Sequence, residues 1–269
     1  MIGGALMATL SIFANVKITD PKKAEVFIDA LDASAKEPKR KPSVPDIPIL
    51  SDVDEIRRLM AKRVTAKMRG FVTVNILDMI EAIGEDRVKQ ILSDFLSEEL
   101  GEFEIFLKKN AIDFAKRKMS VTHLVINEAG NLAAFFTLTH KAVGVSDYGL
   151  SSASRKKIRR YAQIDEKSNS YMVSAFLIAQ FGKNFSVQSD ETLDGNRLME
   201  NAIKILERVQ RDVGGGVVYL KCEDNPKLLS FYGNERNGFH VFEERYSETD
   251  NTKYIQLMRF FRQPIRAFM

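Results

Sequence analysis

The sequence predicts an α/β (α+β) fold in which a mixed central sheet carries helices on both faces. Two observations support this prediction. A strand, a helix and a second strand follow one another over residues 170–222, and a unit of this length makes a right-handed crossover between parallel strands. A hairpin precedes this unit and two further strands follow it, so antiparallel strands are expected beside the parallel pair.

The composition is that of a globular protein without disulfides. The chain has 269 residues, of which 45% are hydrophobic, and this is enough to bury a substantial core. The net charge of +4 is too small to indicate nucleic acid binding by itself. Cys222 is the single cysteine, so an internal disulfide is excluded and a cytoplasmic location is expected. No apolar run approaches the roughly 20 residues of a membrane span, and the apolar start lacks the charged leading region of a secretory signal.

The first part of the chain, residues 1–67, is expected to be an appendage to a main domain of residues 68–269. A short strand and an amphipathic helix are predicted over residues 12–35. Four of the seven prolines fall in residues 36–50, which predicts an extended linker. A second helix is expected over residues 52–64.

Capping residues and glycines mark the helix ends. Asp20, followed by proline, predicts the start of the first helix, and Ser51 is the expected cap of the second. Gly214 opens a run of three glycines that ends the long helix of the main domain. Asn225 precedes a proline and is expected to cap the short helix that follows it.

The main domain begins with helices and continues with strands. Residues 146–169 are polar and are expected to be irregular. The periodic segments outside the crossover are helices over 75–83, 86–96 and 103–117, a hairpin of 120–127 and 132–143, and strands over 240–246 and 254–261.

The crossover unit organises the rest of the chain. Its first strand, residues 170–181, is a nearly unbroken apolar run, which is typical of a strand buried on both faces. A polar loop leads to an amphipathic helix over residues 197–213, and the second buried strand covers 217–222. The amides at the start of this helix lie beyond the carboxyl end of the first strand, where unpaired donors and the helix dipole favour an anion.

These segments resemble the GCN5-related N-acetyltransferase (GNAT) superfamily over residues 71–261. The resemblance rests on the order of the elements and on Phe231-Tyr232 followed by Gly238-Phe239, which is similar to the family's aromatic-Tyr and Gly-Phe pattern. Residues 104–126 and 135–143 resemble the acetyltransferase toxins of toxin-antitoxin pairs most closely. The resemblance implies a GNAT fold and transfer of an acetyl group from acetyl-CoA to an amine by direct attack.

The resemblance also implies a set of cofactor contacts. The amides at the helix start would bind the pyrophosphate of acetyl-CoA, and backbone groups at the end of the first strand would hold its pantetheine arm in a sheet-like manner. The residues that occupy these positions, together with two on the turn and helix after the second strand, are Gln180, Phe181, Gly195, Asn196, Arg197, Leu198, Asn225 and Ser230.

Tyr232 is the residue that the resemblance assigns to catalysis. A leaving thiolate needs a proton, and a tyrosine near the sulfur can supply it as the general acid. The alternative is a half-buried tyrosine that packs the last helix. No residue stands out as a general base, and one cysteine with three scattered histidines does not make a metal site.

The phosphate loop departs from the family pattern of Arg/Gln-x-x-Gly-x-Gly/Ala. Gly195 takes the place of the last glycine, Leu193 stands at the first glycine, and Asp190 occupies the Arg/Gln position. An aspartate repels a pyrophosphate unless it points away. This departure keeps a second function open, in which a non-catalytic GNAT-fold module binds protein or RNA.

The acceptor and the partners are less defined. The toxin-like relatives acetylate aminoacyl-tRNA, and the basic run at residues 155–160 is either an RNA contact or a solvated loop. Residues 1–67 resemble the toxin-binding tail of an antitoxin, which predicts an inhibitory segment, with an oligomerisation arm as the alternative. We expect a homo-oligomer with no membrane partner.

Overall fold

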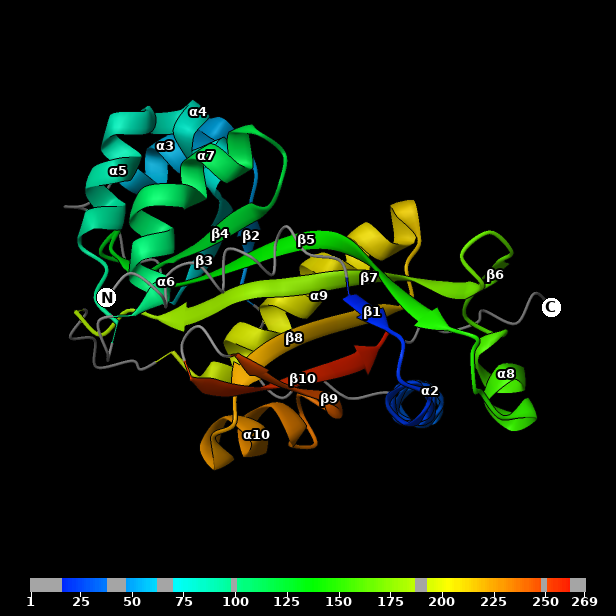
Figure 1. Ribbon diagram of the computed structural model, residues 1–269. Coiled ribbons are helices and arrows are strands. Elements are labelled where there is room, and N and C mark those ends of the chain that lie inside the picture. The colour runs from blue at the N-terminus through cyan, green and yellow to red at the C-terminus, as the bar shows by residue number, and fades with distance from the viewer. Residues whose placement is uncertain are drawn as a thin grey trace. The chain divides into compact units, whose positions relative to one another are not determined.

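The computed structural model divides into two compact units. Unit 1 holds the described residues within 42–139 and 178–202, and unit 2 holds those within 14–41, 140–177 and 203–269. Three elements pass from one unit into the other along the chain: β5 (Leu132–Ser146), β7 (Ser170–Lys183) and α9 (Gly195–Val213). The structure describes residues 16–37, 47–61, 70–97, 101–186, 193–247 and 251–261 (Figure 1).

Unit 1 contains a mixed sheet. β2 (Ile49–Leu50) runs parallel to β3 (Val72–Asn75). β3 pairs antiparallel with β4 (Val121–Ile126), and β4 forms the predicted antiparallel hairpin with β5. The hairpin turn is closed by Asn127, whose side-chain Oδ1 accepts the amide of Asn131 at 2.9 Å.

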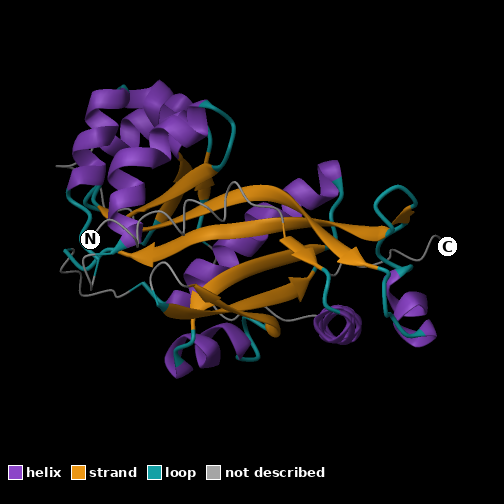
Figure 2. Cartoon of the chain, viewed as in Figure 1, coloured by secondary structure: helices purple, strands orange, loops and turns teal. Residues whose placement is uncertain are grey.

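Helices pack against one face of this sheet and enclose the core of unit 1 (Figure 2). Val72 and Val74 of β3, Leu124 of β4 and Phe135 of β5 belong to this core, which we call the helical cluster. The helices are α3 (Val53–Ala61), α4 (Ile76–Ile83), α5 (Glu85–Ser93), α6 (Glu102–Ile105), the π-helix η1 (Phe106–Asn110) and α7 (Ala111–Lys116).

The first half of α9 covers the other face of the sheet in unit 1. Thr73 alternates with Val72 and Val74, so its side chain points away from the helical cluster. Its Oγ1 donates to Oδ1 of Asn201 on α9 at 2.9 Å, and Nδ2 of Asn201 donates to the carbonyl of Ile47 at 3.1 Å. The predicted mixed sheet with helices on both faces is therefore confirmed in this unit.

Unit 2 also contains a mixed sheet. β7 pairs in parallel with β8 (Val217–Glu223), and Ala175, Phe176 and Leu177 face Val217, Val218 and Tyr219 across the ladder. This pairing confirms the predicted parallel strand-helix-strand unit. The remaining strands are β1 (Val16–Ile18), β6 (Ile164–Asp165), β9 (His240–Ser247) and β10 (Thr252–Phe260), of which β10 lies antiparallel between β8 and β9.

The amino-terminal segment is built into the sheet and core of unit 2. β1 pairs in parallel with the end of β5, and α2 (Pro21–Lys36) packs on β9 and β10. The Phe27 ring lies edge-on to Phe242 with a centroid distance of 5.1 Å, and the amide of Phe260 donates to Oγ of Ser34 at 3.0 Å. The expected appendage of residues 1–67 thus supplies β1 and α2 to unit 2 and β2 and α3 to unit 1. An inhibitory or oligomerising role for it stays a prediction.

The helix caps agree with the sequence in three places and differ in one. Asp20 caps α2, Gly214 follows α9 with a φ of 80°, and Asn225 caps α10 (Pro226–Gly233). The prediction that Ser51 caps α3 is wrong. Oδ1 of Asp52 accepts the amide of Glu55 at 2.8 Å, and α3 begins at Val53, one residue after the predicted start.

Two further findings concern the whole described chain. The segment 146–169, expected to be irregular, contains α8 (Ser152–Ile158) as well as β6. None of the helices seen in the described residues has both the length and the apolar character that crossing a membrane requires.

Truncation of Phe27 tests whether α2 is structural. Phe27 is fully buried, and we expect Phe27→Ala to lower the free energy of unfolding by about 3–5 kcal/mol, because it removes a large buried ring. Urea denaturation measures the loss. The matched control is Val26→Ala at a side chain that is 50% exposed, which we expect to change stability by less than about 0.5 kcal/mol. Equal effects of the two variants would show that α2 is not part of the core.

Candidate functional site

The start of α9 is fixed firmly on unit 1. The side chains of Leu198 and Met199 are fully buried, and Asn201 is held by its hydrogen bonds to Thr73 and Ile47. The guanidinium of Arg197 lies over the ring of Phe71, 6.0 Å from its centroid. The predicted cofactor residues at this helix start therefore occupy a rigid position.

Asp194 supplies a carboxylate at the point where an anion would bind. Its Oδ1 accepts the amide of Asn196 at 3.2 Å, and its carbonyl accepts the amide of Leu198 at 3.0 Å. A carboxylate in this place is favoured by the helix dipole, and a bound phosphate would have to displace it. Asp190, the residue expected at the Arg/Gln position, lies outside the described residues. Asp194 was not predicted at this place, although an aspartate before Gly195 is a common helix cap.

The carboxyl end of β7 is irregular. Ala179 packs against the helical cluster, and a Cβ added to Gly182 would lie 3.5 Å from Phe135 and 3.8 Å from Phe95, two members of the same cluster. A regular strand would place residues three apart on opposite faces. The alternation is therefore broken between Ala179 and Gly182, as in a β-bulge.

Gln180 and Phe181 differ in their surroundings. Gln180 is 1% exposed, and neither Nε2 nor Oε1 of its carboxamide has a hydrogen-bond partner within the described residues. Phe181 is half-buried. A buried carboxamide without partners is unfavourable, so Gln180 lowers the stability of the fold at this strand end.

Tyr232 lies on α10 in unit 2 and is buried, with 8% of its surface exposed. Its ring stands edge-on to Phe231 and Phe239 at centroid distances of 5.0 and 6.1 Å. Burial raises the pKa of Tyr232 well above its ordinary value, and the charge of Cys222 is a second, smaller cause of the same shift. The hydroxyl therefore stays protonated at neutral pH, which is the state that a general acid requires.

The other predicted residues of unit 2 have structural roles or are exposed. Oδ1 of Asn225 accepts the amide of Lys227 at 2.9 Å and caps α10, and Ser230 is exposed on the same helix. Burial, followed by the charges of Asp224 and Glu223, raises the pKa of Cys222 to about 11. The thiol is thus protonated at neutral pH, which agrees with a packing role rather than a nucleophile.

The predicted site residues fall into two groups. Gln180, Phe181 and the helix start at 195–198 belong to unit 1, and Asn225, Ser230 and Tyr232 lie on the turn and helix after β8 in unit 2.

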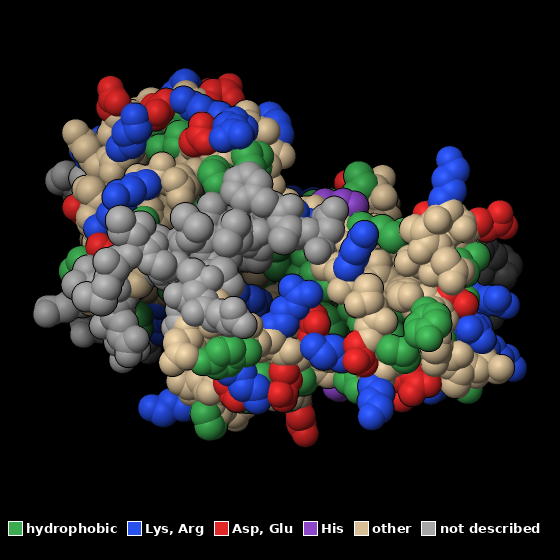
Figure 3. Space-filling model, viewed as in Figure 1, with side chains coloured by type: hydrophobic (Ala, Val, Ile, Leu, Met, Phe, Trp, Pro, Cys, Tyr) green, Lys and Arg blue, Asp and Glu red, His purple; other side chains and the backbone are tan. Residues whose placement is uncertain are grey.

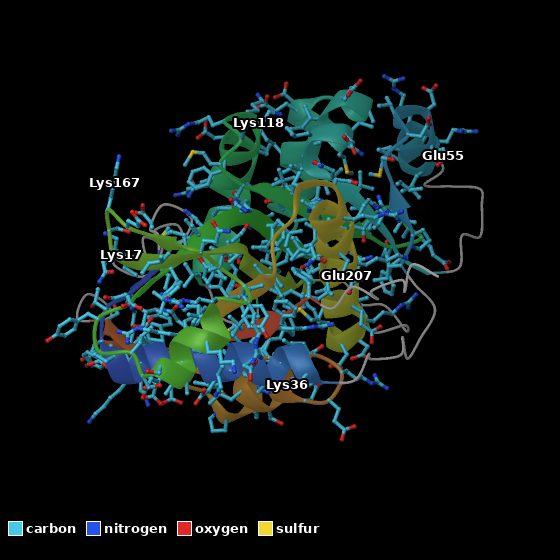
Figure 4. The ribbon with its side chains drawn as sticks, turned by 90° about the vertical axis from the view of Figure 1, so that its right-hand side faces the viewer. Lys17, Lys36, Glu55, Lys118, Lys167 and Glu207 are labelled. Carbon is cyan, nitrogen blue, oxygen red and sulfur yellow. The ribbon has the colours of Figure 1, made fainter. Side chains whose placement is uncertain are left out.

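The basic run at residues 155–160 is engaged inside unit 2, where residues 155–158 lie on α8 and the last two residues follow it. Arg155 donates to Asp147 at 2.9 Å, Lys157 to Asp29 at 2.7 Å and Arg160 to Asp32 at 2.6 Å. Two of these acceptors lie on α2, and Figure 4 shows α8 beside α2, which ends at the labelled Lys36. The run therefore joins two helices and does not present a row of unpaired cations to RNA.

The surface of the unit 1 helices is mixed in charge. Figure 3 shows Lys and Arg side chains interspersed with Asp and Glu over these helices. Glu85 contacts both Lys89 and Lys116, and Arg117 pairs with Asp113 at 3.1 Å. This pattern is typical of a solvated face with local ion pairs.

The two histidines of the hairpin strands are held by their surroundings. His123 stacks on Phe136 at a centroid distance of 5.2 Å, and burial lowers its pKa to about 4. His140 forms a 3.0 Å hydrogen bond with Oγ of Ser174. In the described part of the chain, no three His, Cys, Asp or Glu residues gather in a group that could hold a metal ion.

Comparison with known proteins gives distant likenesses in structure alone. No family model matches the chain, and no curated protein matches it. The chain is similar to a mutant of KacT, with 14% identity, a TM-score of 0.45, and coverage of 69% of this chain and 94% of that chain. It is also similar to AtaT complexed with acetyl-methionyl-tRNAfMet, with 16% identity, a TM-score of 0.44, and coverage of 63% and 86%. It is similar as well to AtaTR bound with AcCoA, with 15% identity, a TM-score of 0.43, and coverage of 72% of this chain and 94% of that chain.

The pKa of His123 predicts a pH dependence of stability. Its folded value of about 4 lies below the ordinary 6.5, so the unfolded chain binds the proton more tightly and stability falls as pH drops from about 6.5 to about 4. We expect this group alone to remove about 3 kcal/mol over that window. Urea titrations of the wild type and of His123→Phe at several pH values measure the difference. Parallel pH profiles would show that His123 titrates normally in the folded protein.

Proposed function

We propose that this chain is an acyl-CoA-dependent N-acetyltransferase. The observation that carries the proposal is the passage from β7 to α9. A strand with an irregular carboxyl end leads to a 19-residue helix whose first turn is anchored on the sheet, and the same strand pairs in parallel with β8. Irregular strand ends followed by helix starts are places where backbone groups bind extended, anionic ligands.

The residues of unit 1 fit acetyl-CoA in part. The backbone at Gln180 and Phe181 lies at the break in the strand's alternation, where it can bond to the pantetheine arm in a sheet-like manner. The helix start at residues 195–198 offers a positive dipole end to the pyrophosphate. The carboxylate of Asp194 opposes an anion at this place, so we expect cofactor binding to be weaker than a helix start without it would give.

Tyr232 has the protonation state that the reaction needs. The amine nitrogen attacks the thioester carbonyl carbon, the new C–N bond forms, the C–S bond breaks, and the thiolate takes the proton of the Tyr232 hydroxyl. The nitrogen releases its extra proton to solvent, and the tyrosinate takes a proton back from solvent. The raised pKa keeps the hydroxyl protonated at neutral pH, and it also makes Tyr232 a weaker acid than an ordinary tyrosine. The amine itself enters the reaction unprotonated, and no residue is assigned here as its base.

The acceptor and the physiological role are narrower hypotheses. A toxin that acetylates the amino group of aminoacyl-tRNA in the cytoplasm remains the hypothesis that the sequence resemblance favours, but the basic run of α8 gives it no support. Residues 1–67 could still inhibit the enzyme or join subunits of a homo-oligomer. Deleting them would remove α2 from the core of unit 2, so point variants on exposed positions of this segment are the better test.

A non-catalytic binding module is the alternative function. The carboxylate of Asp194 at the start of α9 favours it, because this group satisfies donors that a pyrophosphate would otherwise bind. Isothermal titration with acetyl-CoA separates the two functions. Binding supports the enzyme, and the absence of heat at millimolar ligand would favour the module.

Asp194 provides a graded test of the pyrophosphate site. We expect Asp194→Asn to tighten acetyl-CoA binding about tenfold, because it removes a negative charge and keeps an oxygen that can cap the helix. Titration calorimetry measures the dissociation constant. Asp212→Asn, at the other end of α9, is a charge-matched control whose affinity should equal that of the wild type. Equal tightening in both variants would mean that net charge, and not a site at Asp194, governs binding.

Tyr232 provides the test of catalysis. We expect Tyr232→Phe to lower kcat by about 10²-fold or more with little change in KM, because the leaving thiolate loses its proton donor. A thiol-release assay with a panel of amines and peptides measures the rate. Tyr148→Phe, at a side chain that is 75% exposed, should match the wild type. Full activity of Tyr232→Phe would exclude this tyrosine as the acid.

A further inference from the structure

The short helix that carries Tyr232 has little apolar packing of its own. α10 has eight residues, and Tyr232 is the one residue of this helix that is buried. A helix of this length is marginal unless other groups fix it, because most helical stability in proteins comes from packing of an apolar face. The direction of the Tyr232 hydroxyl therefore depends on the contacts that hold the two ends of α10.

The carboxyl-terminal end of α10 is held by the turn that follows it. A helix leaves its last four carbonyls without partners inside the helix. Nδ2 of Asn237 donates to the carbonyl of Phe231 at 2.7 Å. The amide of Phe239 donates to the carbonyl of Tyr232 at 3.0 Å. Two of the four carbonyls are thus paired with groups of the turn, and one of the two belongs to Tyr232 itself.

Asn237 is itself fixed from two sides. Its backbone amide donates to Oδ1 of Asn234 at 2.9 Å, and its carbonyl accepts a hydrogen bond from Nη1 of Arg259 on β10 at 3.1 Å. Its side chain is fully buried. A side chain held by packing and by a braced backbone presents its N–H in one direction. The bond to Phe231 therefore ties the last turn of α10 to the sheet of unit 2.

We propose that Asn237 is a positioning residue for the reaction and sets the direction of the Tyr232 hydroxyl through the carbonyl of Phe231. The inference rests on the proposed function, because it takes Tyr232 as the acid that protonates the leaving thiolate. It adds a residue that acts through this tyrosine and not on the substrate. A displacement of about 1 Å can cost up to about 10²-fold in rate, so a loose last turn of α10 slows the proton transfer.

The test is a double-mutant cycle of Asn237→Ala and Tyr232→Phe in the full-length protein, measured by thiol release from acetyl-CoA. In the wild-type background we expect Asn237→Ala to lower kcat about tenfold with a nearly unchanged KM. In the Tyr232→Phe background, where the hydroxyl is already absent, we expect it to change kcat by less than about twofold. A purely structural role would lower the folded fraction, and with it the rate, by the same factor in both backgrounds.

Ser151→Ala is the matched control. Oγ of Ser151 accepts the amide of Ser154 at 3.1 Å and caps α8, so this variant also removes a bond from a side chain to the backbone of a helix in unit 2. We expect it to lower Tm and to leave kcat unchanged in both backgrounds. Asn237→Leu, which removes the donor and fills most of the volume, repeats the cycle if Asn237→Ala does not fold.

The outcomes separate the inference from the proposed function. Equal effects of Asn237→Ala in the two backgrounds, or an unchanged kcat in the wild-type background, would overturn the inference alone. Full activity of Tyr232→Phe would overturn the inference together with the proposed role of this tyrosine. Wild-type protein that releases no thiol with any acceptor, water included, would overturn the proposed function and the inference with it.

Discussion

The attachment of the α9 start to the sheet of unit 1 is the constraint on which the candidate site depends. A helix terminus can receive a ligand only if its first turn does not move, and here Leu198 and Met199 are buried while Asn201 ties β3 to the segment that carries Ile47. These contacts come from residues far apart in the sequence. They hold the helix start on the sheet of unit 1, the unit to which the end of β7 also belongs.

Periodicity predicted the regular elements well because their burial is periodic. The apolar spacing of α2 and α9 and the continuous apolar runs of β7 and β8 each identify a buried face, and all four elements are present. α8 was missed because Lys157 on this helix and Arg160 just after it pair with Asp29 and Asp32 of α2, more than a hundred residues earlier in the chain. Such pairs leave no local signal. The cap at Asp52 was missed for a simpler reason, since two adjacent residues could serve and only backbone geometry decides between them.

The site was predicted less completely than the fold. Positions at the end of β7 and the start of α9 follow from the strand-helix order, but their chemistry does not. The break in alternation near Gln180 could not be predicted, because a strand buried on both faces is apolar throughout. Its sequence therefore does not show which residues point to which face of the sheet. The role of Asp194 depends on which atoms reach the first amides of α9. Gln180 has no hydrogen-bond partner among the described residues, and this can be recognised only from the positions of its neighbours.

The pairing of the first strand has a consequence for synthesis of the protein on the ribosome. β1 aligns with residues 143–145 of β5, and α2 rests on β9 and β10, which are among the last elements to be made. The amino-terminal helix therefore leaves the ribosome long before its binding surface exists, with the apolar side chains of Phe27, Ile28 and Leu31 still in water. Unit 2 can close only after nearly the whole chain has been released. A truncated chain that lacks β9 and β10 would keep the apolar face of α2 exposed to solvent. We expect such a chain to be bound by chaperones or degraded by proteases.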